Sequence, residues 1–496
     1  MRISSRSILT VLVMSATLVA CNEALVPDFN TLTGFPHSVS ALQNEMSGAL
    51  NGLRSDVGAF DLSMDAFARS AAYYTPSEPR FVTEWTGENA LDDDNFGAAI
   101  WANMFTAIKT ADTIIAILPT LTSNGAPVPT ASVKALQGVM ETTKALGYMY
   151  VALSHDTNGV AMNSPGGAIT GNIAPILCAR DSWKEIVAML DTAKAELDAA
   201  GPGTTLGIPN SGFTLQLPPG FAALGTTAGS FEGLTLAVRA RARIEYAYAI
   251  ARGPGGSAPT ATTPGSPDQS QLDSAITDIT SSSLYTSNLS GGEAVAANDL
   301  GAFHSWSSAA GDVSNPIFGN AASVFVLERA AKQIDTLNDL RFLAKFGIAP
   351  ALPTSPGASL ASSYSYLNNI GLSTPTPIVR NIELQFLLAR AYLGTGQLVQ
   401  AAQTVNAVRT TVGGLASGLP GVNTASYPSV RDFLMQEMLP SLMQDGTGDQ
   451  IVAVRDYGLV TQDLTTWGSA DFHTSVMNIP QVERTQRNNN FAPVCP

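Results

Sequence analysis

The spacing of the histidines in this sequence does not indicate a metal site. They are His37, His155, His304 and His473, and they are scattered over the chain. None lies in an H-E-x-x-H pattern, which would place two imidazoles on one face of a helix as zinc ligands. The spacing therefore argues against a metalloprotease, and no metal or other cofactor is predicted.

Other patterns that carry catalysis are also missing from the sequence. There is no G-x-S-x-G elbow for a nucleophilic serine, and no lysine follows a glycine loop that could cradle phosphates. The string DDDNFG at 92–97 resembles the start of a calcium loop, but Phe96 stands at its fifth position and Asn103 at its twelfth, where a bidentate glutamate is needed. It is predicted to be a solvated turn or a helix N-terminus. A pair of distant carboxylates about 5–10 Å apart in a cleft, as in glycosidases, stays open.

Aromatic residues outside the helical stripes are the candidates for ligand contact. A flat ring stacks on the apolar C–H face of a sugar-like molecule, while amides and carboxylates around it accept hydroxyl protons. Tyr73, Tyr74 and Trp85 lie among acidic and amide residues in a loop-like region, and Trp306 lies with Phe303 and His304 in the string GAFHSWSSAAGD. Tyr73, Tyr74, Trp85 and Trp306 are therefore the predicted ligand-binding residues. The alternative is that each packs a loop onto the body of the protein.

Helical spacing dominates the pattern that must position these residues. Residues 387–409 read as two helices around a glycine turn, at the spacing of a tetratricopeptide unit. Pro119 and Gly201 mark predicted helix ends, and the pair 181–182 a predicted N-cap. Long irregular segments, which often carry function, interrupt the helices, and the end of the chain reads as mostly extended. Further helices are predicted over 39–57, 60–74, 96–118, 131–156, 181–200, 234–253 and 429–446.

Composition narrows the possible partners. The chain has 496 residues and a net charge of −14, with 40 acidic against 26 basic residues. Proteins that track phosphates are rich in clustered Lys and Arg, so nucleic acid is an unlikely ligand class by charge. The length exceeds the usual limit for one core, which predicts two lobes or an extended helical array with loops packed on it.

The amino terminus has the features of an export signal. Arg2 and Arg6 precede an apolar run over 8–20 that is too short to span a bilayer, and Cys21 follows directly. The residues before this cysteine resemble the bacterial lipobox, in which the thiol receives a diacylglycerol, the signal is cleaved and the new amino group is acylated. Two or three acyl chains would hold the mature chain to a membrane. An ordinary secretory signal with an incidental cysteine is the alternative.

Two further cysteines remain after this processing. Cys178 and Cys495 would lie in an oxidising compartment, where disulfides persist. Their pairing would staple the end of the chain to the segment PILCARDSW. Two separate thiols are equally compatible with the sequence, because nothing in it fixes the distance between them.

Several blocks, in order along the chain, resemble the SusD/RagB family of outer-membrane nutrient-binding lipoproteins. WANMFTAIKTADTII is similar to the family's W-x-x-x-aromatic-x-x-I-x-x-A-[ND] helix through Trp101, Phe105, Ile108, Ala111 and Asp112. ETTKALGYMYVALSHDTNGVAMN resembles the helix and loop that lead toward its glycan-facing side, and MNIPQVERTQRNNN the closing I-P-x-x-E-x-x-x-N. The resemblance covers most of the chain.

A later block is also similar, but it is followed by departures. PIVRNIELQFLLARAYLGTGQLVQAAQTVNAVR resembles a family arrangement through Arg380 and Glu383, which are expected to form a structural ion pair or to tether a loop. In the next helix Met438 and Pro440 replace a usual charged pair. The chain is therefore similar to a divergent member, and its ligand cannot be taken from the family's starch binders. Trp101, Phe105, Tyr392 and Ala401 are expected to be core residues, given their helical spacing.

The resemblance implies a fold class and a domain plan. The fold would be mainly α, with tetratricopeptide-like helix pairs in a right-handed superhelical scaffold and long irregular loops packed on it. The expected parts are a signal peptide at 1–20, a lipid-anchored tether at 21–36, an N-terminal helical region at 37–230, a helix with irregular loops at 231–320 and a C-terminal region at 321–496.

It also implies a function without catalysis. The chain would be a surface lipoprotein of the outer membrane that binds an oligosaccharide or a peptide and passes it to a TonB-dependent, SusC-like β-barrel transporter. Asn22 after the lipidated cysteine mildly favours the outer membrane, because many inner-membrane lipoproteins have Asp there. The alternative is an envelope scaffold or assembly lipoprotein that binds proteins through its helical repeats.

Overall fold

The computed structural model describes residues 39–94, 96–162, 173–293, 299–310, 312–368, 370–417, 421–460, 474–488, 492, 493 and 495. The predicted signal and tether, with Cys21 and His37, lie outside the described residues, as does His473. Within the described ranges, no helix has both the length and the apolar character needed to cross a membrane.

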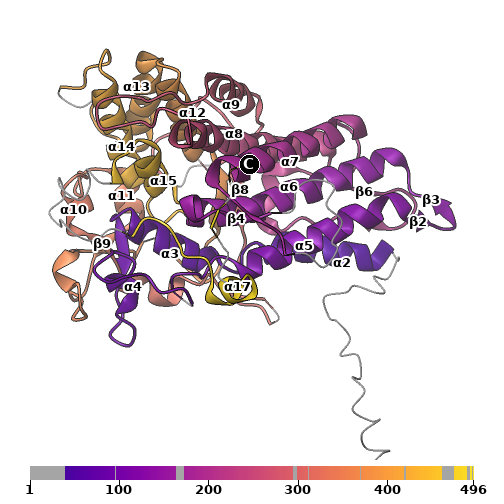
Figure 1. The fold of residues 1–496 in the computed structure, drawn as a ribbon, viewed down its shortest axis with the longest axis horizontal. Helices are drawn as coiled ribbons and strands as arrows, with labels where there is room; N and C mark the ends of the chain where they lie inside the picture. Colours follow the sequence, from indigo (N-terminus) through magenta and orange to yellow (C-terminus); the bar gives the residue numbers. More distant parts are fainter. Residues whose placement is uncertain are drawn as a thin grey trace, which may run out of the picture.

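One group of helices runs side by side along the longest axis of the molecule (Figure 1). In chain order each helix packs against the next, from α5 to α6, α7, α8 and α9. Two glycines of α6 permit close approach, since a Cβ at Gly138 would lie 2.6 Å from Leu197 Cγ and one at Gly147 2.7 Å from Ile108 Cγ1. The bounds are α2 Val39–Gly52, α5 Ala102–Ile117, α6 Thr130–His155, α7 Ala179–Ala200, α8 Ala228–Arg252 and α9 Gln269–Ser281.

The beginnings of these helices follow local chemistry in part. Helix α8 starts with a capping box, in which Thr227 and Ser230 satisfy each other's backbone amides through their side chains. The predicted N-cap of α7 at 181–182 is wrong, because that helix begins two residues earlier, at Ala179, with Cys178 as its N-cap. The helices predicted over 131–156 and 429–446 form close to those bounds, and the one predicted over 234–253 begins earlier, at Ala228. The helix predicted over 39–57 ends at Gly52, whereas the one predicted over 96–118 begins only at Ala102.

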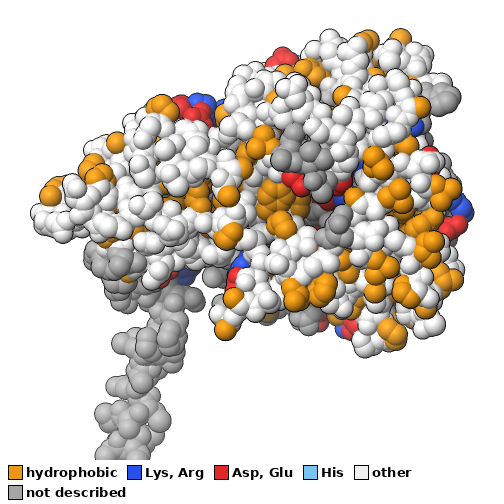
Figure 2. All heavy atoms as spheres, turned by 180° about the vertical axis from the view of Figure 1, so that it is seen from behind, with side chains coloured by type: hydrophobic (Ala, Val, Ile, Leu, Met, Phe, Trp, Pro, Cys, Tyr) orange, Lys and Arg blue, Asp and Glu red, His pale blue; other side chains and the backbone are white. Residues whose placement is uncertain are grey.

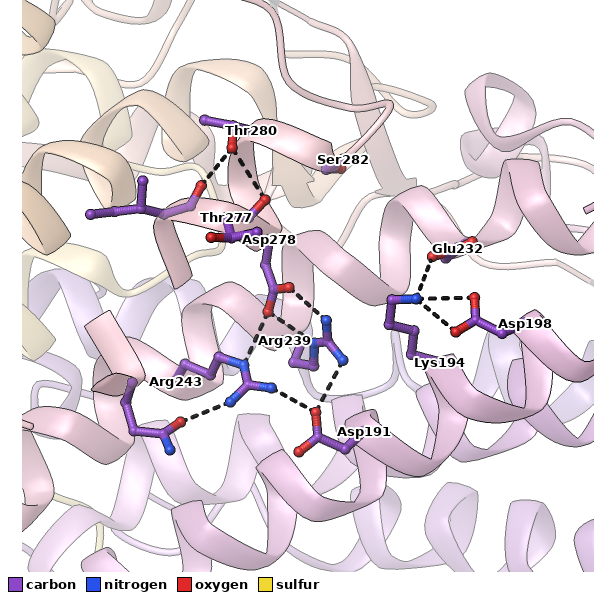
Figure 3. Close-up of polar contacts among 12 residues, drawn as sticks. Asp191, Lys194, Asp198, Glu232, Arg239, Arg243, Thr277, Asp278, Thr280 and Ser282 are labelled. Carbon is purple, nitrogen blue, oxygen red and sulfur yellow. Dashed lines mark hydrogen bonds and ion pairs between the residues drawn. The ribbon is translucent and has the colours of Figure 1, made fainter. Parts of the chain in front are cut away.

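Buried and half-buried ion pairs clamp three of these helices together (Figure 3). Arg239 of α8 binds Asp278 of α9 with Nη2 at 2.6 Å and Asp191 of α7 with Nη1 at 3.0 Å. Arg243, one turn later, bridges the same two carboxylates. These two arginines of α8 therefore hold α7 and α9 in fixed positions on either side of it.

A second helical group contains the predicted tetratricopeptide-like hairpin. Helices α12 (Asn381–Gly394) and α13 (Leu398–Ala407) pack on each other, and the turn between them uses Gly396 at φ +75°, which favours glycine. The mainly α fold with paired helices is confirmed. The group is completed by α14 Tyr427–Leu442 and α15 Asp449–Asp456.

A buried charge network joins the two groups. The guanidinium of Arg390 on α12 is fully buried and lies 2.9 Å from Glu245 of α8 and 2.5 Å from Asp456 of α15. Arg241 of α8 binds Asp449 at 2.9 Å. Because buried charges are tolerated only when they are paired, this network requires the three helices to sit in one register.

The remaining part of the fold is a small antiparallel sheet in the order β1-β9-β11-β10. The prediction of helix over 60–74 is wrong at its end, where α3 stops at Phe67 and β1 begins at Ala71. Ala71 pairs with Val326, a partner far away in the sequence. The segments read as irregular also contribute strands. The strands are β1 Ala71–Tyr73, β9 Val324–Leu327, β10 Gly347–Ile348 and β11 Ala361–Ser365, while β8 Gly301–His304 pairs with β12 Thr376–Arg380.

Short elements complete the described chain. The carboxyl-terminal segment, predicted to be mostly extended, includes a short helix, α17, from Gln481 to Gln486. The other short helices are α3 Val57–Phe67, α4 Arg80–Thr83, α10 Glu328–Ala331 and α11 Leu340–Lys345, and the two-residue strands are β2 Thr122–Ser123, β3 Ala126–Pro127, β4 Val160–Ala161, β5 Ile176–Leu177, β6 Gly207–Ile208 and β7 Phe213–Thr214.

The face opposite to that of Figure 1 carries few charges among its described residues. On the face seen from behind in Figure 2, hydrophobic side chains are scattered widely and charged side chains are sparse. Among the side chains coloured in that view no basic stripe is visible, and the face offers nothing that would track a phosphate backbone.

Candidate functional site

A groove of about 930 Å³ lies between α5, α6 and α17. We call it the Trp101 groove. Its size is within the range of small-molecule sites in proteins, about 300–1,000 Å³. Apolar side chains make up most of its lining, with a few polar groups at the edges. A surface of this kind can hold a molecule that has an apolar face and polar edges.

Three aromatic rings line the groove. The ring centroid of Trp101 lies 4.9 Å from that of Phe105, and Phe105 lies 5.9 Å from Tyr148 of α6. Trp101 is the N-cap of α5 and Phe105 stands one turn later, so both rings occupy one side of the helix. Trp101 and Tyr148 are largely buried, whereas Phe105 is half-buried. Phe105 therefore presents most of the accessible ring surface, whereas Trp101 and Tyr148, each 6% exposed, add only a little.

A buried histidine supports the indole from behind. The His155 ring lies 4.9 Å from Trp101 in an edge-to-face contact, and its Nδ1 is 3.1 Å from the carbonyl oxygen of Val151. Burial lowers the pKa of His155 to about 4, and the positive charge of Arg455 acts in the same direction. The imidazole is therefore neutral at neutral pH and is a packing partner of the indole.

The two walls of the groove come from distant parts of the chain. One wall is the segment before β5, with Ile173 and Ala174, and the other is α17, with Val482 and Glu483. Ile173 is 51% exposed and Val482 69% exposed, so both present apolar surface toward solvent at the rim. Such exposed apolar groups beside a groove are typical of a binding surface.

The charged groups of the lining are mostly held in ion pairs. Asp112 binds Lys144 at 2.6 Å, and Arg487 binds Glu483 at 2.5 Å. Burial raises the pKa of the Tyr148 phenol, and Asp112 adds to this, so the hydroxyl keeps its proton and can donate it in a hydrogen bond. The groove thus offers hydrogen-bonding groups around an aromatic floor, and the chemistry fits binding.

Two of the predicted ligand-binding aromatics are core residues instead. Trp85 is 1% exposed, and its Nε1–H donates to the carbonyl oxygen of Phe96 at 3.0 Å. Tyr74 is 3% exposed, and its hydroxyl donates to the carbonyl oxygen of Gly357 at 3.1 Å. The prediction that these rings are exposed is wrong, because the supposed loop folds into β1 and α4 and turns both rings inward with their polar atoms satisfied.

Tyr73 is half-buried and packs a loop. Its ring lies 5.1 Å from that of Phe81, and its hydroxyl donates to Asn320 Oδ1 at 2.9 Å. These contacts match the alternative given for Tyr73, in which the ring packs a loop onto the body of the protein. Tyr73 does not line the Trp101 groove.

Trp306 lines a separate hollow of about 550 Å³, which we call the Trp306 hollow. The residue is only 6% exposed, so its indole is not the open platform that was predicted. Its Nε1–H donates to Thr376 Oγ1 at 3.1 Å, and the guanidinium of Arg54 lies 5.6 Å from its ring centroid. Arg54 is also paired with Asp312. The hollow is polar, with Asn51 and Ser373 among its lining residues.

The remaining sequence-based site residues have structural roles. Cys178 and Cys495 form a disulfide with a Cα–Cα distance of 5.4 Å. Arg380 lies 2.5 Å from Glu293 and 3.2 Å from Asp299, so it tethers an irregular loop, while Glu383 pairs with an arginine of α8. Cys21 lies outside the described residues.

The expectation that Trp101 is a core residue is confirmed, and Phe105 is half-buried against the same core. The sequence did not show that these rings also line a groove. The signal was present as two aromatic residues four apart on one helix. Helical spacing of this kind looks the same for a buried stripe and for the floor of a groove. Among the described residues, the positions of α17 and of the 173–174 segment show that a groove remains along this edge of the helix.

The arrangement of paired helices, loops and small sheet is similar to that of solved SusD superfamily proteins. A SusD superfamily protein from Bacteroides thetaiotaomicron is similar over 91% of this chain and 98% of its own, at 13% identity and a TM-score of 0.62. A laminarin-binding SusD-like protein is similar over 90% of this chain and 97% of its own, at 13% identity and a TM-score of 0.61.

A third similar structure is described as containing a xylogluco-oligosaccharide. The similarity extends over 84% of this chain and 83% of that protein, at 14% identity and a TM-score of 0.56. No protein-family model and no curated protein matches the sequence. At such low identity the likeness defines the fold of this chain, which is the SusD fold.

Proposed function

We propose that this chain is a divergent SusD/RagB protein that binds an oligosaccharide in the Trp101 groove without catalysis. The observation that carries the proposal is the groove of about 930 Å³ in which the half-buried ring of Phe105 is flanked by Trp101 and Tyr148. Sugar rings present apolar C–H faces that pack against aromatic rings, and hydroxyl groups at their edges bind polar side chains.

The rim of the groove supports the same ligand class. Asp94 can accept hydroxyl protons, and Gln486 offers both a donor and an acceptor. The similar structures that are described as binding laminarin and as containing a xylogluco-oligosaccharide make a neutral polysaccharide fragment the first ligand to try. A peptide remains the second ligand class to test.

The Trp306 hollow is proposed as an additional sugar contact. Asn51, Ser307 and Ser373 present amide and hydroxyl groups there, beside the edge of Trp306 and the Arg54 side chain. Because the indole is largely buried, hydrogen bonds to hydroxyl groups would supply most of the binding at this place, with little stacking.

The setting of this binding is also part of the proposal. Cys21 carries the lipid, the chain is anchored to the outer membrane at its surface, and a TonB-dependent SusC-like barrel receives the ligand. Exposed apolar side chains support a protein partner, since Leu337 is 77% exposed and Ile348 75% exposed. They equally support the alternative function, an envelope scaffold that binds proteins.

Calorimetry with the soluble mature chain tests the ligand class. Laminari-oligosaccharides and xyloglucan oligosaccharides are titrated into the wild type and into Phe105→Ala, whose half-buried ring can be removed with modest damage to the core. We expect binding to weaken about tenfold, since the lost aromatic contact is worth about 1.5 kcal/mol. Phe318→Ala, at an exposed ring away from the groove, is the matched control.

Two results would contradict the proposed function. Equal affinity of Phe105→Ala and the wild type would place the ligand elsewhere. If neither oligosaccharides nor peptides bind the wild type, the scaffold function is favoured. Pull-down of the lipidated protein from membranes, followed by identification of its partners, tests the transporter part separately, because a β-barrel partner is expected only under the uptake function.

A further inference from the structure

The two walls of the Trp101 groove are joined by a covalent bond. The first wall, at Ile173 and Ala174, continues through β5 directly to Cys178. The second wall, α17, is followed by the end of the chain, where Cys495 lies. The disulfide between these cysteines spans 317 positions of sequence. It therefore connects the far end of each wall to the other.

The second wall has little hydrophobic anchoring of its own. None of the six residues of α17, all of them described, is buried. A helix of this length is marginal in water unless packing supports it. The chain just before α17 is anchored in the core by Met477 and Ile479, which are 0% and 3% exposed. The start of α17 is held by polar contacts, in which the Gln481 amide donates to the carbonyl oxygen of Asp93 at 2.7 Å and Asn478 Nδ2 donates to that of Leu91 at 2.9 Å.

Polar contacts of α17 also reach the first wall. Arg487 donates from Nη1 to the carbonyl oxygen of Ala174 at 2.5 Å, and Arg484 binds Asp93 at 2.5 Å. The Arg484 side chain is 34% exposed, where an ion pair contributes only about 0–1 kcal/mol, whereas the Arg487 side chain is 7% exposed and holds α17 more firmly. A cross-link that limits how far α17 can move away is worth more than any one of these contacts.

We propose that the Cys178–Cys495 disulfide assembles the Trp101 groove, so that the oxidised chain has a closed second wall and the reduced chain has lost it. Its consequence for ligand binding rests on the function proposed above. A dithiol reductant transfers two electrons and two protons to the Sγ–Sγ bond, which gives two cysteine thiols, and the reductant becomes a disulfide. Re-formation needs a disulfide oxidant, which accepts the same two electrons and protons.

Hydrogen exchange with mass spectrometry tests the structural part without any ligand. The samples are the oxidised mature chain, the same chain treated with dithiothreitol, and the Cys178→Ser/Cys495→Ser variant. The buffer contains EDTA, because the two sulfur atoms and a carboxylate oxygen of Asp181 lie within 4.8 Å of one another and could hold a metal ion after reduction. Peptides covering 477–488 report on α17, and peptides from α6 serve as the internal reference.

We expect hydrogen exchange in 477–488 to become about 30-fold faster in both samples that lack the disulfide, with exchange in α6 unchanged. This factor corresponds to about 2 kcal/mol, the lower end of the stabilisation that a disulfide typically provides. Unchanged exchange in 477–488 would overturn the inference, and so would equal acceleration in α6, since the bond would then stabilise the whole fold. Titration of laminarihexaose into the same samples is a separate measurement. Faster exchange without any oligosaccharide binding supports the wall mechanism and rejects the proposed ligand.

Discussion

The stability of this protein should depend on pH through one buried imidazole beneath the groove. His155 is fully buried against Trp101, and burial lowers its pKa from 6.5 to about 4. As the pH falls below 6.5, the unfolded chain takes up a proton at this residue, whereas the folded chain does not until about pH 4. The neutral imidazole therefore contributes fully to stability above pH 6.5, and the contribution is lost between pH 6.5 and 4.

The size of the effect follows from the two pKa values. At pH 7 both states are nearly unprotonated, so little free energy is involved. At pH 5 the unfolded imidazole is almost fully protonated and the folded one is not, which lowers the free energy of unfolding by about 2 kcal/mol. Between pH 6.5 and pH values below 4, the total loss in the free energy of unfolding reaches about 3 kcal/mol, because the pKa of His155 falls from 6.5 in the unfolded chain to about 4 in the folded one.

Urea unfolding of the wild type and of His155→Asn at pH 7 and pH 5 measures this loss. The substitution leaves a cavity and therefore destabilises the protein at both pH values, but its cost should be about 2 kcal/mol smaller at pH 5. Other buried groups with shifted pKa values, such as His304 and Asp65, are present in both proteins and cancel in the difference. A cost that is the same at the two pH values would show that His155 does not titrate as its burial implies.

Two further predictions concern charge burial and packing. Arg390→Met should lower the free energy of unfolding by about 3–5 kcal/mol, because it leaves the buried Glu245 without its ion-pair partner and Asp456 with only Arg252 at 3.4 Å. Lys332→Ala, at a pair exposed on both sides, should change it by less than about 1 kcal/mol, and similar effects of the two substitutions in urea unfolding would contradict the network. Gly138→Ala should destabilise the protein by about 1–2 kcal/mol, since its Cβ would meet Leu197 Cγ at 2.6 Å, while Gly48→Ala, in an open helical position, should stabilise it by about 0.5–1 kcal/mol. Thermal unfolding measures both glycine variants, and a Gly138→Ala protein more stable than the wild type would refute the close contact with Leu197.

Local patterns in the sequence determined most of the helices. The hairpin within 387–409 follows from apolar spacing and a glycine between two helices, and both are properties of neighbouring residues. The same reasoning failed at Ala71–Tyr73, which fits a helical period but forms β1. That strand exists because it pairs with β9, more than 250 positions later in the chain, and no local pattern contains such a partner.

The site divides in the same way. The sequence by itself supplied the aromatic residues, the two cysteines and the helical periods that carry Trp101 and Phe105. It did not determine which rings face a cavity, and Trp85, chosen as an exposed ring, is 1% exposed. Only the tertiary structure decided that α17 lies across from the 173–174 segment and that Cys178 reaches Cys495. The physical reason is that exposure and cross-linking depend on which distant segments meet, and folding sets those contacts through the packing of the whole chain.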